Sequence, residues 1–531
     1  MTWKKRIISI VLCLCALLCA ASVRAEAEDA ATTHTDHLVC GGTTCDHKTG
    51  THITNTPTWK AWNGTTTINN DFFGSLTEKY LYLSQDVTPG DYIIVPKGKT
   101  LYLCLNGHSL KSKAYYAIYV SGTLVLCDCN GSEQGKGVIS HGEEDGSICG
   151  ADGIYVVDNA IFTMYGGTIS NNDGRGVLVS GGTFTMYGGE ISHNTCITKS
   201  AAGGGGVWVK DDDSNIGNFT MYGGTICKNT YKGIGNCGGG GVYASGTGDF
   251  IIQGGEITNN QCSYSATNTS NGASGGGLYI SGKPRELKIE NCTISNNTCD
   301  GEGGGIFIIS NETGSITNCT ISNNSATGAS SKGGGLAFDT ATVTITGGIT
   351  DNKTAGKGGA MAVGSWGEDS KITLSSGLEF SGNAQGCTAD KNGKLIGGTA
   401  NDVYLNGSAY LRLADDFSKT STAAIVVTTA SEPDAYGYKK IAEDNRTTPD
   451  PTDFKYGNDD TAICTYTVTE GENKTVELRA CKHSGAWKPN TDDASSGHWR
   501  KCTNCDTTET ASHSGGDLYL HGLQRYKDRA D

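Results

Sequence analysis

A short phrase recurs along this chain with few changes. "FTMYGGTIS" begins at Phe162, "FTMYGGEIS" at Phe184 and "FTMYGGTIC" at Phe219. A unit that recurs in this way cannot bury its apolar face alone, so consecutive copies must stack on one another. Successive starts lie 22, 35, 31, 37, 27 and 29 residues apart, because related phrases begin at Phe250, Leu287, Gly314 and Val343.

The repeat has strand periodicity rather than helix periodicity. Phe-Thr-Met-Tyr alternates apolar and polar residues, and a Gly-Gly bend and a short segment ending near Ile follow it. The shortest period of 22 residues leaves no room for a helix. A second strand-like phrase lies between the copies: "GGGVWV" (204–209), "GGGVYA" (239–244), "GGGLYI" (275–280), "GGGIFI" (303–308), "GGGLAF" (333–338), "GGAMAV" (358–363) and, earlier, "GRGVLV" (174–179).

These strands and bends predict an all-β parallel β-helix. Glycine contributes 77 of 531 residues without a Gly-X-Y period, which excludes collagen and suits a chain that turns often. An asparagine stands three residues after the repeat isoleucine in every copy, where its amide is expected to bond the backbone of the next coil. The seven positions are Asn172, Asn194, Asn229, Asn260, Asn297, Asn324 and Asn352.

"FTMYGGTISNN" and "GGGVYA" resemble the repeats of secreted and surface bacterial proteins with the right-handed parallel β-helix of the pectin-lyase-like superfamily. They are more loosely similar to the repeats of chlamydial polymorphic outer-membrane proteins. The resemblance implies a right-handed solenoid, and the superfamily includes polysaccharide lyases and glycoside hydrolases as well as proteins of other function. A fold alone does not choose between these activities.

The solenoid needs covered ends, because unpaired strand edges invite aggregation. We expect β-rich caps on both sides of it and small Cys/His-rich terminal modules. The predicted boundaries are 1–25 signal peptide, 26–79 Cys/His-rich N-terminal segment and cap, 80–405 parallel β-helix, 406–478 β-rich C-terminal cap, 479–516 Cys/His-rich zinc-binding module and 517–531 tail.

The first 25 residues have a basic start, an apolar core and small residues before Glu26, as a secretory signal peptide has. No later segment is apolar enough to span a bilayer. The leader contains four basic residues, so the mature chain would carry 37 Lys and Arg against 55 Asp and Glu. This acidic balance argues against a nucleic-acid partner. We therefore expect a secreted or cell-surface protein.

Eighteen of the 21 cysteines lie beyond the leader. Cys104 and Cys127 stand in the same register one period apart, either as stacked apolar side chains or as a bond between coils. Cys196, Cys262 and Cys299 each follow a repeat asparagine by two residues and would form an interrupted column. In an exported protein disulfides are allowed, and the sequence leaves these alternatives open.

Cysteine and histidine also cluster at both ends. The N-terminal cluster includes Cys40 and Cys45, and the C-terminal cluster contains a Cys-x2-Cys hook. Thiolate and imidazole ligands in such spacing suit a structural zinc ion, with a disulfide or solvated loops as the alternative. The predicted ligands at the C-terminal cluster are Cys481, Cys502, Cys505 and His513.

Alternation in the second phrase predicts a row of aromatic side chains on the outside. If Val207 and Val209 face the core, Trp208 faces outward. Rings about 4.8 Å apart roughly match the advance of one sugar in an extended glycan, so the row is a candidate binding strip. Loops folded over this face are the alternative. The strip residues are Trp208, Tyr243, Tyr279 and Phe307, with Tyr155 and Leu178 on earlier coils.

Catalytic groups are sparse by comparison. Glu190 and Glu256 share an outward column but lie two strand spacings apart, about 9.6 Å, which is too wide for a retaining glycosidase. The acidic run 211–213 is typical of a solvated loop. The sequence therefore favours a non-catalytic adhesin or glycan-binding stalk that contacts a glycan or another cell-surface macromolecule. The alternatives are a polysaccharide lyase or glycoside hydrolase of the same fold and a structural spacer.

Overall fold

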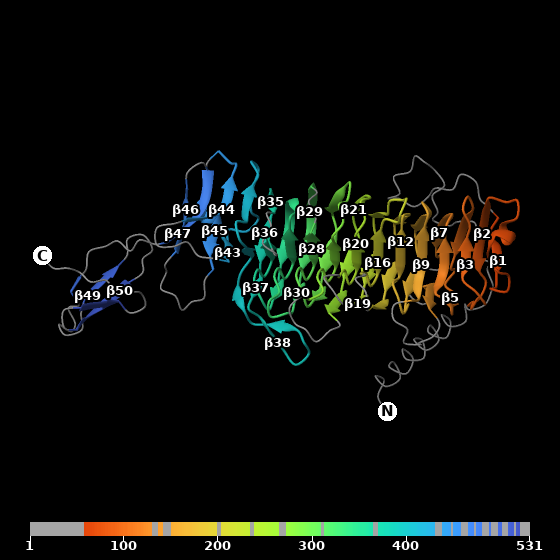
Figure 1. The fold of residues 1–531 in the computed structure, drawn as a ribbon, viewed down its shortest axis with the longest axis horizontal. Helices are drawn as coiled ribbons and strands as arrows, with labels where there is room; N and C mark the ends of the chain where they lie inside the picture. Colours follow the sequence, from red (N-terminus) through yellow and green to blue (C-terminus); the bar gives the residue numbers. More distant parts are fainter. Residues whose placement is uncertain are drawn as a thin grey trace, which may run out of the picture.

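The computed structural model is a rod of stacked β-coils (Figure 1). It describes residues 58–129, 136–141, 150–198, 203–233, 238–264, 272–309, 313–364, 370–430, 438–447, 450–457, 466–471 and 474–480, and the strands at 488–489, 498–501, 508–514 and 517–520.

Each full coil carries four short strands, which stack on the next coil as four parallel ladders. We number the ladders 1 to 4 in the order in which the chain meets them. Ladder 1 holds the "FTM" strands, and equivalent residues of successive repeats lie directly opposite each other, as Phe162, Phe184 and Phe219 do. Its strands are β1 (Lys60–Trp62), β2 (Glu78–Leu83), β4 (Thr100–Cys104), β7 (Thr123–Cys127), β10 (Ile161–Met164), β13 (Thr183–Met186), β17 (Asn218–Met221), β21 (Phe250–Ile252), β25 (Leu287–Glu290), β29 (Thr313–Ser322), β32 (Thr342–Thr350), β35 (Lys371–Leu374), β42 (Tyr410–Leu413) and β44 (Tyr438–Asp444).

Ladder 2 holds the short strands that follow the Gly-Gly bend. It joins ladder 1 in one 24-stranded sheet, since β29 and β32 run straight through both. Its other strands are β5 (Ser109–Ser112), β8 (Val138–His141), β11 (Thr168–Ser170), β14 (Glu190–Ser192), β18 (Thr225–Cys227), β22 (Glu256–Thr258), β26 (Thr293–Ser295) and β36 (Glu379–Ser381).

Ladder 3 follows the asparagine turn and is an eight-stranded sheet that ends in an antiparallel pair, β37 with β40. Beside it lies a small hairpin of β38 (Thr388–Ala389) and β39 (Leu395–Ile396). The ladder 3 strands are β15 (Thr195–Ile197), β19 (Thr230–Gly233), β23 (Gln261–Tyr264), β27 (Thr298–Cys299), β30 (Ser325–Ala326), β33 (Lys353–Thr354), β37 (Ala384–Gln385) and β40 (Thr399–Ala400).

Ladder 4 holds the strands of the glycine phrase in a 13-stranded parallel sheet. These strands are β3 (Ile93–Val95), β6 (Tyr116–Val120), β9 (Asp152–Val157), β12 (Val177–Ser180), β16 (Val207–Lys210), β20 (Val242–Ala244), β24 (Leu278–Ile280), β28 (Ile306–Ile309), β31 (Leu336–Asp339), β34 (Met361–Val363), β41 (Val403–Leu405), β43 (Ile425–Thr429) and β45 (Phe454–Tyr456).

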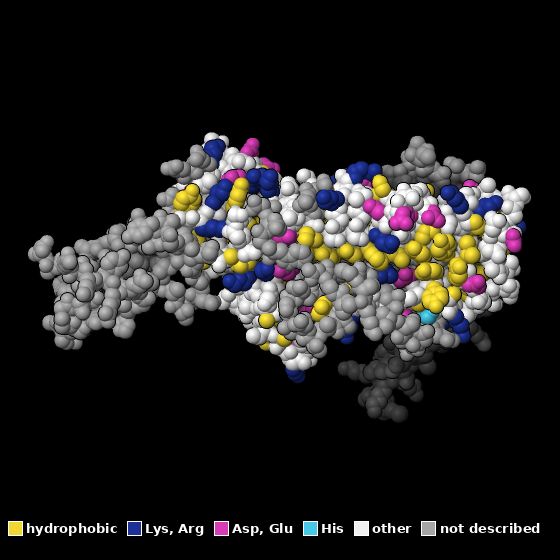
Figure 2. Space-filling model, in the orientation of Figure 1, with side chains coloured by type: hydrophobic (Ala, Val, Ile, Leu, Met, Phe, Trp, Pro, Cys, Tyr) yellow, Lys and Arg dark blue, Asp and Glu magenta, His cyan; other side chains and the backbone are white. Residues whose placement is uncertain are grey.

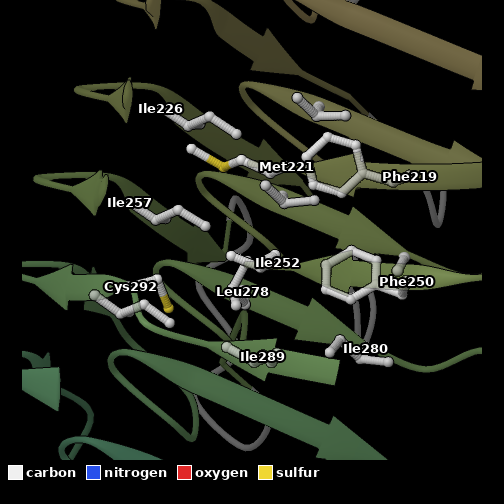
Figure 3. Packing of buried hydrophobic residues seen from close by; sticks show 14 of the residues in the cluster. Phe219, Met221, Ile226, Phe250, Ile252, Ile257, Leu278, Ile280, Ile289 and Cys292 are labelled. Atoms are coloured by element: carbon white, nitrogen blue, oxygen red, sulfur yellow. The ribbon is translucent and has the colours of Figure 1, made fainter. Parts of the chain in front are cut away.

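One continuous apolar core fills the rod. Phe162, Phe184, Phe219 and Phe250 stack along it with ring centroids 4.7, 5.4 and 5.6 Å apart. Figure 3 shows inward-facing side chains of three consecutive coils packed against each other. The all-β parallel solenoid predicted from the repeats is confirmed.

The coils extend beyond the interval 80–405 in both directions. Strand β1 already pairs in parallel with β2, and β43 and β45 continue ladder 4 after residue 405. These outer coils lack the repeated phrase, so the sequence pattern does not mark them.

At the N-terminal end, the short helix α2 (Asn70–Phe73) buries Phe73 against the core, and Asn69 caps it by accepting a hydrogen bond from the backbone N–H of Phe72. At the other end, antiparallel strands β46 (Tyr466–Glu470) and β47 (Thr475–Ala480) close the stack through β44. A 3-10 turn, η1 (Pro451–Asp453), precedes β45. A four-stranded antiparallel sheet follows, with β48 (Lys488–Pro489), β49 (His498–Lys501), β50 (Thr508–Ser514) and β51 (Asp517–Leu520).

The asparagine column forms a continuous hydrogen-bonded ladder, as predicted. From Asn194 onward, each side-chain Oδ1 accepts from both the backbone N–H (2.9–3.2 Å) and the Nδ2 (2.7–3.2 Å) of the asparagine one coil before it. The Nδ2 also donates to an isoleucine carbonyl of the preceding coil at 2.8–3.0 Å. The ladder continues past the repeats through Asn383 to the carboxylate of Asp402. All of its members are buried.

The residue before each ladder asparagine has a left-handed backbone, with φ between 54° and 57°. Asparagine adopts this conformation more readily than most residues, which explains the doubled "NN" of the repeat. The seven residues are Asn171, His193, Lys228, Asn259, Asn296, Asn323 and Asp351.

We expect Asn260→Ala to lower the free energy of unfolding by roughly 3 kcal/mol, because the buried N–H groups of Asn229 lose their acceptor. Asn259→Gly is the matched control, since Asn259 is exposed and glycine accepts its φ of 57°. It should change the stability by less than about 0.5 kcal/mol. Urea unfolding followed by circular dichroism measures both. Equal losses for the two variants would contradict a ladder that stabilises the coils.

Candidate functional site

An aromatic column runs along the outer face of ladder 4. The strand register places Trp208, Tyr243, Tyr279 and Phe307 directly above one another, which confirms the predicted alternation. Their rings stack nearly parallel, with centroids 5.9, 5.1 and 5.3 Å apart and interplanar angles of 14 to 16°. They belong to a cluster separate from the core of the rod, so the rings point away from the coil interior.

The outward direction of the four rings does not leave them all exposed, because three of them are buried. Tyr243 and Tyr279 keep 8% and 3% of their surface, and Phe307 keeps none. Tyr243 and Tyr279 lie between the rings of their neighbours, Phe307 lies between Tyr279 and Ala337, and the glycine turns pack against the column. A Cβ at Gly203, for example, would lie 2.2 Å from Cδ1 of Tyr243. These three side chains stabilise the stack of coils in this structure.

Trp208 remains partly exposed, and the accessible part of the column lies on the coils before it. Going toward the N-terminus, the same outward position holds Leu178, Tyr155, Tyr119 and Ile94. Figure 2 shows this column as a hydrophobic band along ladder 4 that widens over the N-terminal coils. The alternation in the glycine phrase predicts Tyr155 in this row but does not reach β6 and β3, which lack that phrase.

Four tyrosines gather at this end of the column. We call Tyr92, Tyr116, Tyr119 and Tyr155 the tyrosine cluster, and all four are partly exposed. Tyr116 and Tyr155 lie 4.9 Å apart between ring centroids, and the other contacts measure 5.6 to 6.3 Å at steeper angles. The result is an uneven aromatic surface with several phenol groups at its edge. "YYAIYV" alternates as the glycine phrase does and could have revealed it.

A buried ion pair joins the tyrosine cluster to Trp208. Asp152 and Arg175 stand where later coils have the middle glycine of "GGG", and they lie opposite each other on adjacent coils. Asp152 Oδ1 accepts from the backbone N–H of Arg175 at 2.6 Å and lies 3.4 Å from its Nη1. The Arg175 guanidinium lies 4.5 Å from the Trp208 ring centroid and donates through Nε to the Gly203 carbonyl. This pair positions the indole ring.

Charge and burial shape the chemistry of this surface. Burial raises the pKa of the Asp152 carboxyl despite the neighbouring Arg175. Burial, followed by the negative charge of Asp152, raises the pKa of Tyr116, and burial raises the pKa of Tyr155. The phenols therefore stay neutral at physiological pH and are able to donate and accept hydrogen bonds. Lys210 adds a cation 5.5 Å from the Trp208 ring. A platform of neutral rings with a few polar groups suits a neutral, hydroxyl-rich ligand.

A second row of tyrosines lies at the ends of the "FTMY" strands on ladder 1. Tyr165, Tyr187 and Tyr222 stack with centroids 4.9 Å apart and interplanar angles of 9° and 4°. A shallow cavity of about 280 Å³ lies at the bend beside Tyr165, between Lys136 and Glu190. Its carboxylates are engaged in the fold: Asp128 accepts from the N–H groups of Gly107 and Gly137, and Glu190 pairs with Lys136 at 3.4 Å.

The carboxylates considered for catalysis do not converge. Glu190 and Glu256 are separated in the register by Thr225, as the sequence predicts. Asp211 accepts from the backbone of Gly217 and Thr247, whereas Asp212 accepts from Ser214 and Asn215. Both side chains order their loop.

The zinc ligands predicted at Cys481, Cys502 and Cys505 lie outside the described residues, and His513 lies on β50. Over the ranges that the structure does describe, no three His, Cys, Asp or Glu side chains are grouped so as to hold a metal ion. No helix within those ranges has the length and apolarity needed to cross a bilayer.

The cysteines of the described coils lie where their register places them. Cys104 and Cys127 are opposite each other on β4 and β7, and neither is in a disulfide. Cys196, Cys262 and Cys299 form a buried column on ladder 3, interrupted by Tyr231. Cys196 is disulfide-bonded.

Comparison with known proteins identifies the architecture. Residues 152–409 match the family model described as the right handed beta helix region. No curated protein and no solved structure gave a match to the chain.

Proposed function

We propose that this protein, whose residues 152–409 match a right-handed β-helix, is an exported glycan-binding stalk that acts as a secreted or cell-surface adhesin. The partly exposed tyrosine cluster, continued by Trp208, is the observation that carries the proposal. Its rings follow the axis of the rod, so an extended glycan would lie along ladder 4 with its apolar sugar faces against the aromatic surface. The apparent leader and the acidic net charge support an exported protein without a nucleic-acid partner.

The glycan would contact Tyr119 and Tyr155 first, with Trp208 further along the column. The phenol groups supply hydrogen bonds to sugar hydroxyls, and Arg175 holds the indole in place. Tyr243, Tyr279 and Phe307 would act indirectly, since their stack keeps the coils beyond Trp208 in register. A rigid parallel sheet fixes the spacing of the rings before the ligand arrives, which reduces the entropy lost on binding.

We expect the double variant Tyr119→Ala/Tyr155→Ala to lose at least about tenfold in affinity for the retained glycan, because each removed ring takes away contact area. A glycan array identifies the ligand, and calorimetry measures the loss. Tyr438→Ala is the control, since Tyr438 is 61% exposed on β44 at the other end of the rod. Unchanged affinity in the double variant, with an unchanged circular dichroism spectrum, would contradict the proposal.

Incubation with the same panel of glycans separates the two alternative functions. A lyase or hydrolase would shorten polyuronates or neutral glycans, with or without calcium, and product analysis would detect the fragments. A structural spacer would bind none of the glycans on the array. Either outcome would replace the binding role proposed for the tyrosine cluster.

We also propose that the C-terminal module binds structural zinc through Cys481, Cys502, Cys505 and His513. The support is the ligand spacing in the sequence alone. Purified full-length protein should contain one zinc ion per chain by elemental mass spectrometry, and Cys502→Ser/Cys505→Ser should remove it. A metal-free wild-type chain would leave the disulfide alternative for these cysteines.

A further inference from the structure

Two consecutive coils differ from the four coils before them at the bend between ladders 1 and 2. The bend is Gly-Gly in the coils that begin at Phe162, Phe184, Phe219 and Phe250, but it becomes Asn-Cys in the next two. Cys292 and Cys319 are therefore the equivalent residues of adjacent coils, and the following coil returns to glycine at Gly347.

The backbone of the bend changes so that cysteine fits. In the earlier coils the second glycine has positive φ, for example 87° at Gly255. In the cysteine coils the left-handed residue is instead the asparagine before it, since Asn291 and Asn318 both have φ of 53°. Neither cysteine is among the residues with positive φ, so both hold a side chain without the strain that glycine relieves elsewhere.

The core also makes room for these side chains. A Cβ at Gly255 would lie 2.5 Å from the ε-methyl of Met221 on the coil before it. The residue in register with Met221 on the next coil is Ile252, followed by Ile289. These shorter side chains precede the two cysteine bends. Figure 3 shows Cys292 among the inward-facing side chains.

The two sulfur atoms lie 3.2 Å apart. Cys292 and Cys319 are buried, with 5% and 2% of their surface exposed. The strands on both sides of the bend hold their coils in register, as Ile289 opposite Ile316 and Ile294 opposite Ile321 show. A movement of about 1 Å would bring the sulfurs to the length of a disulfide bond.

We propose that Cys292 and Cys319 form a disulfide that staples two consecutive coils of the β-helix. A small-molecule disulfide such as oxidised glutathione is the oxidant. The Cys319 thiolate attacks one glutathione sulfur and releases the first glutathione thiol; the Cys292 thiolate then attacks Cys319 Sγ in the mixed disulfide and releases the second. One protein S–S bond forms, one glutathione S–S bond breaks, and both protons and both electrons end on the two glutathione thiols.

The two cysteines are interchangeable in this scheme, because either thiol can be the donor in the contact between them. Both side chains are buried in the finished coil, so exchange takes place while the coils are assembling. The closed bond would join positions 27 residues apart and restrict the unfolded chain. This stabilisation would be added at the coil that carries Phe307 and at the coil after it.

The test uses the full-length chain, refolded in mixed reduced and oxidised glutathione, blocked with iodoacetamide under denaturing conditions and digested without reduction. We expect mass spectrometry to find a linked pair of peptides containing Cys292 and Cys319, which separates on reduction. Cys227 is the internal control, because Ser192 and Thr258 lie opposite it in register and it should be recovered as an alkylated thiol.

A second measurement gives the consequence of the bond. Reduction should lower the urea midpoint of the wild-type protein, whereas the same treatment should leave the midpoint of Cys292→Ala/Cys319→Ala unchanged or lower it by a smaller amount. Recovery of both wild-type cysteines as alkylated thiols after refolding would overturn the proposal. The peptide map needs no variant, so the proposal stays open to refutation even if the double variant fails to fold.

Discussion

The buried asparagine ladder is the interaction on which the rest of the structure depends. Every coil must turn between ladders 2 and 3, and a turn inside a packed rod leaves backbone groups that water cannot reach. One amide per coil solves this, since it accepts two hydrogen bonds from the coil before and donates to that coil's isoleucine carbonyl and to the next asparagine. Because each asparagine hydrogen-bonds to the asparagine of the next coil, the ladder fixes the register of the coils. The register in turn places equivalent side chains in columns on every face.

The function proposed for the chain follows from that register. Identical positions of successive coils lie about 4.8 Å apart, so any side chain repeated in the sequence becomes a row in space. On ladder 4 the repeated aromatic residue becomes a stack of rings. From Tyr243 to Phe307 the glycine turns pack against the rings, and the rings there stabilise the rod. At Tyr119 and Tyr155 no such turns cover the rings, which form a surface for a ligand.

Much of the fold could be predicted from the sequence, because each sequence repeat corresponds to one coil of the solenoid. The alternation in "GGGVWV" gave the outward direction of Trp208, and the column of Asn260 and its equivalents gave the ladder. Burial of the rings could not be predicted in the same way. The exposure of Tyr279 depends on how turns of neighbouring coils pack on it, and the spacing of residues along one strand does not contain that information. The aromatic row was not continued to the early coils because "DYIIVP" and "YYAIYV" form ladder 4 strands without the glycines that mark the later ones.

Amide hydrogen exchange of the full-length protein tests the central role of the ladder most directly. The backbone N–H groups of Asn229, Asn260 and Asn297 donate to buried side-chain oxygens of the next coil. If the ladder holds the coils together, these amides exchange among the slowest in the protein and at similar rates, because they open only when coils separate. Exchange of these amides as fast as that of exposed loop amides such as Asp213 would contradict the account.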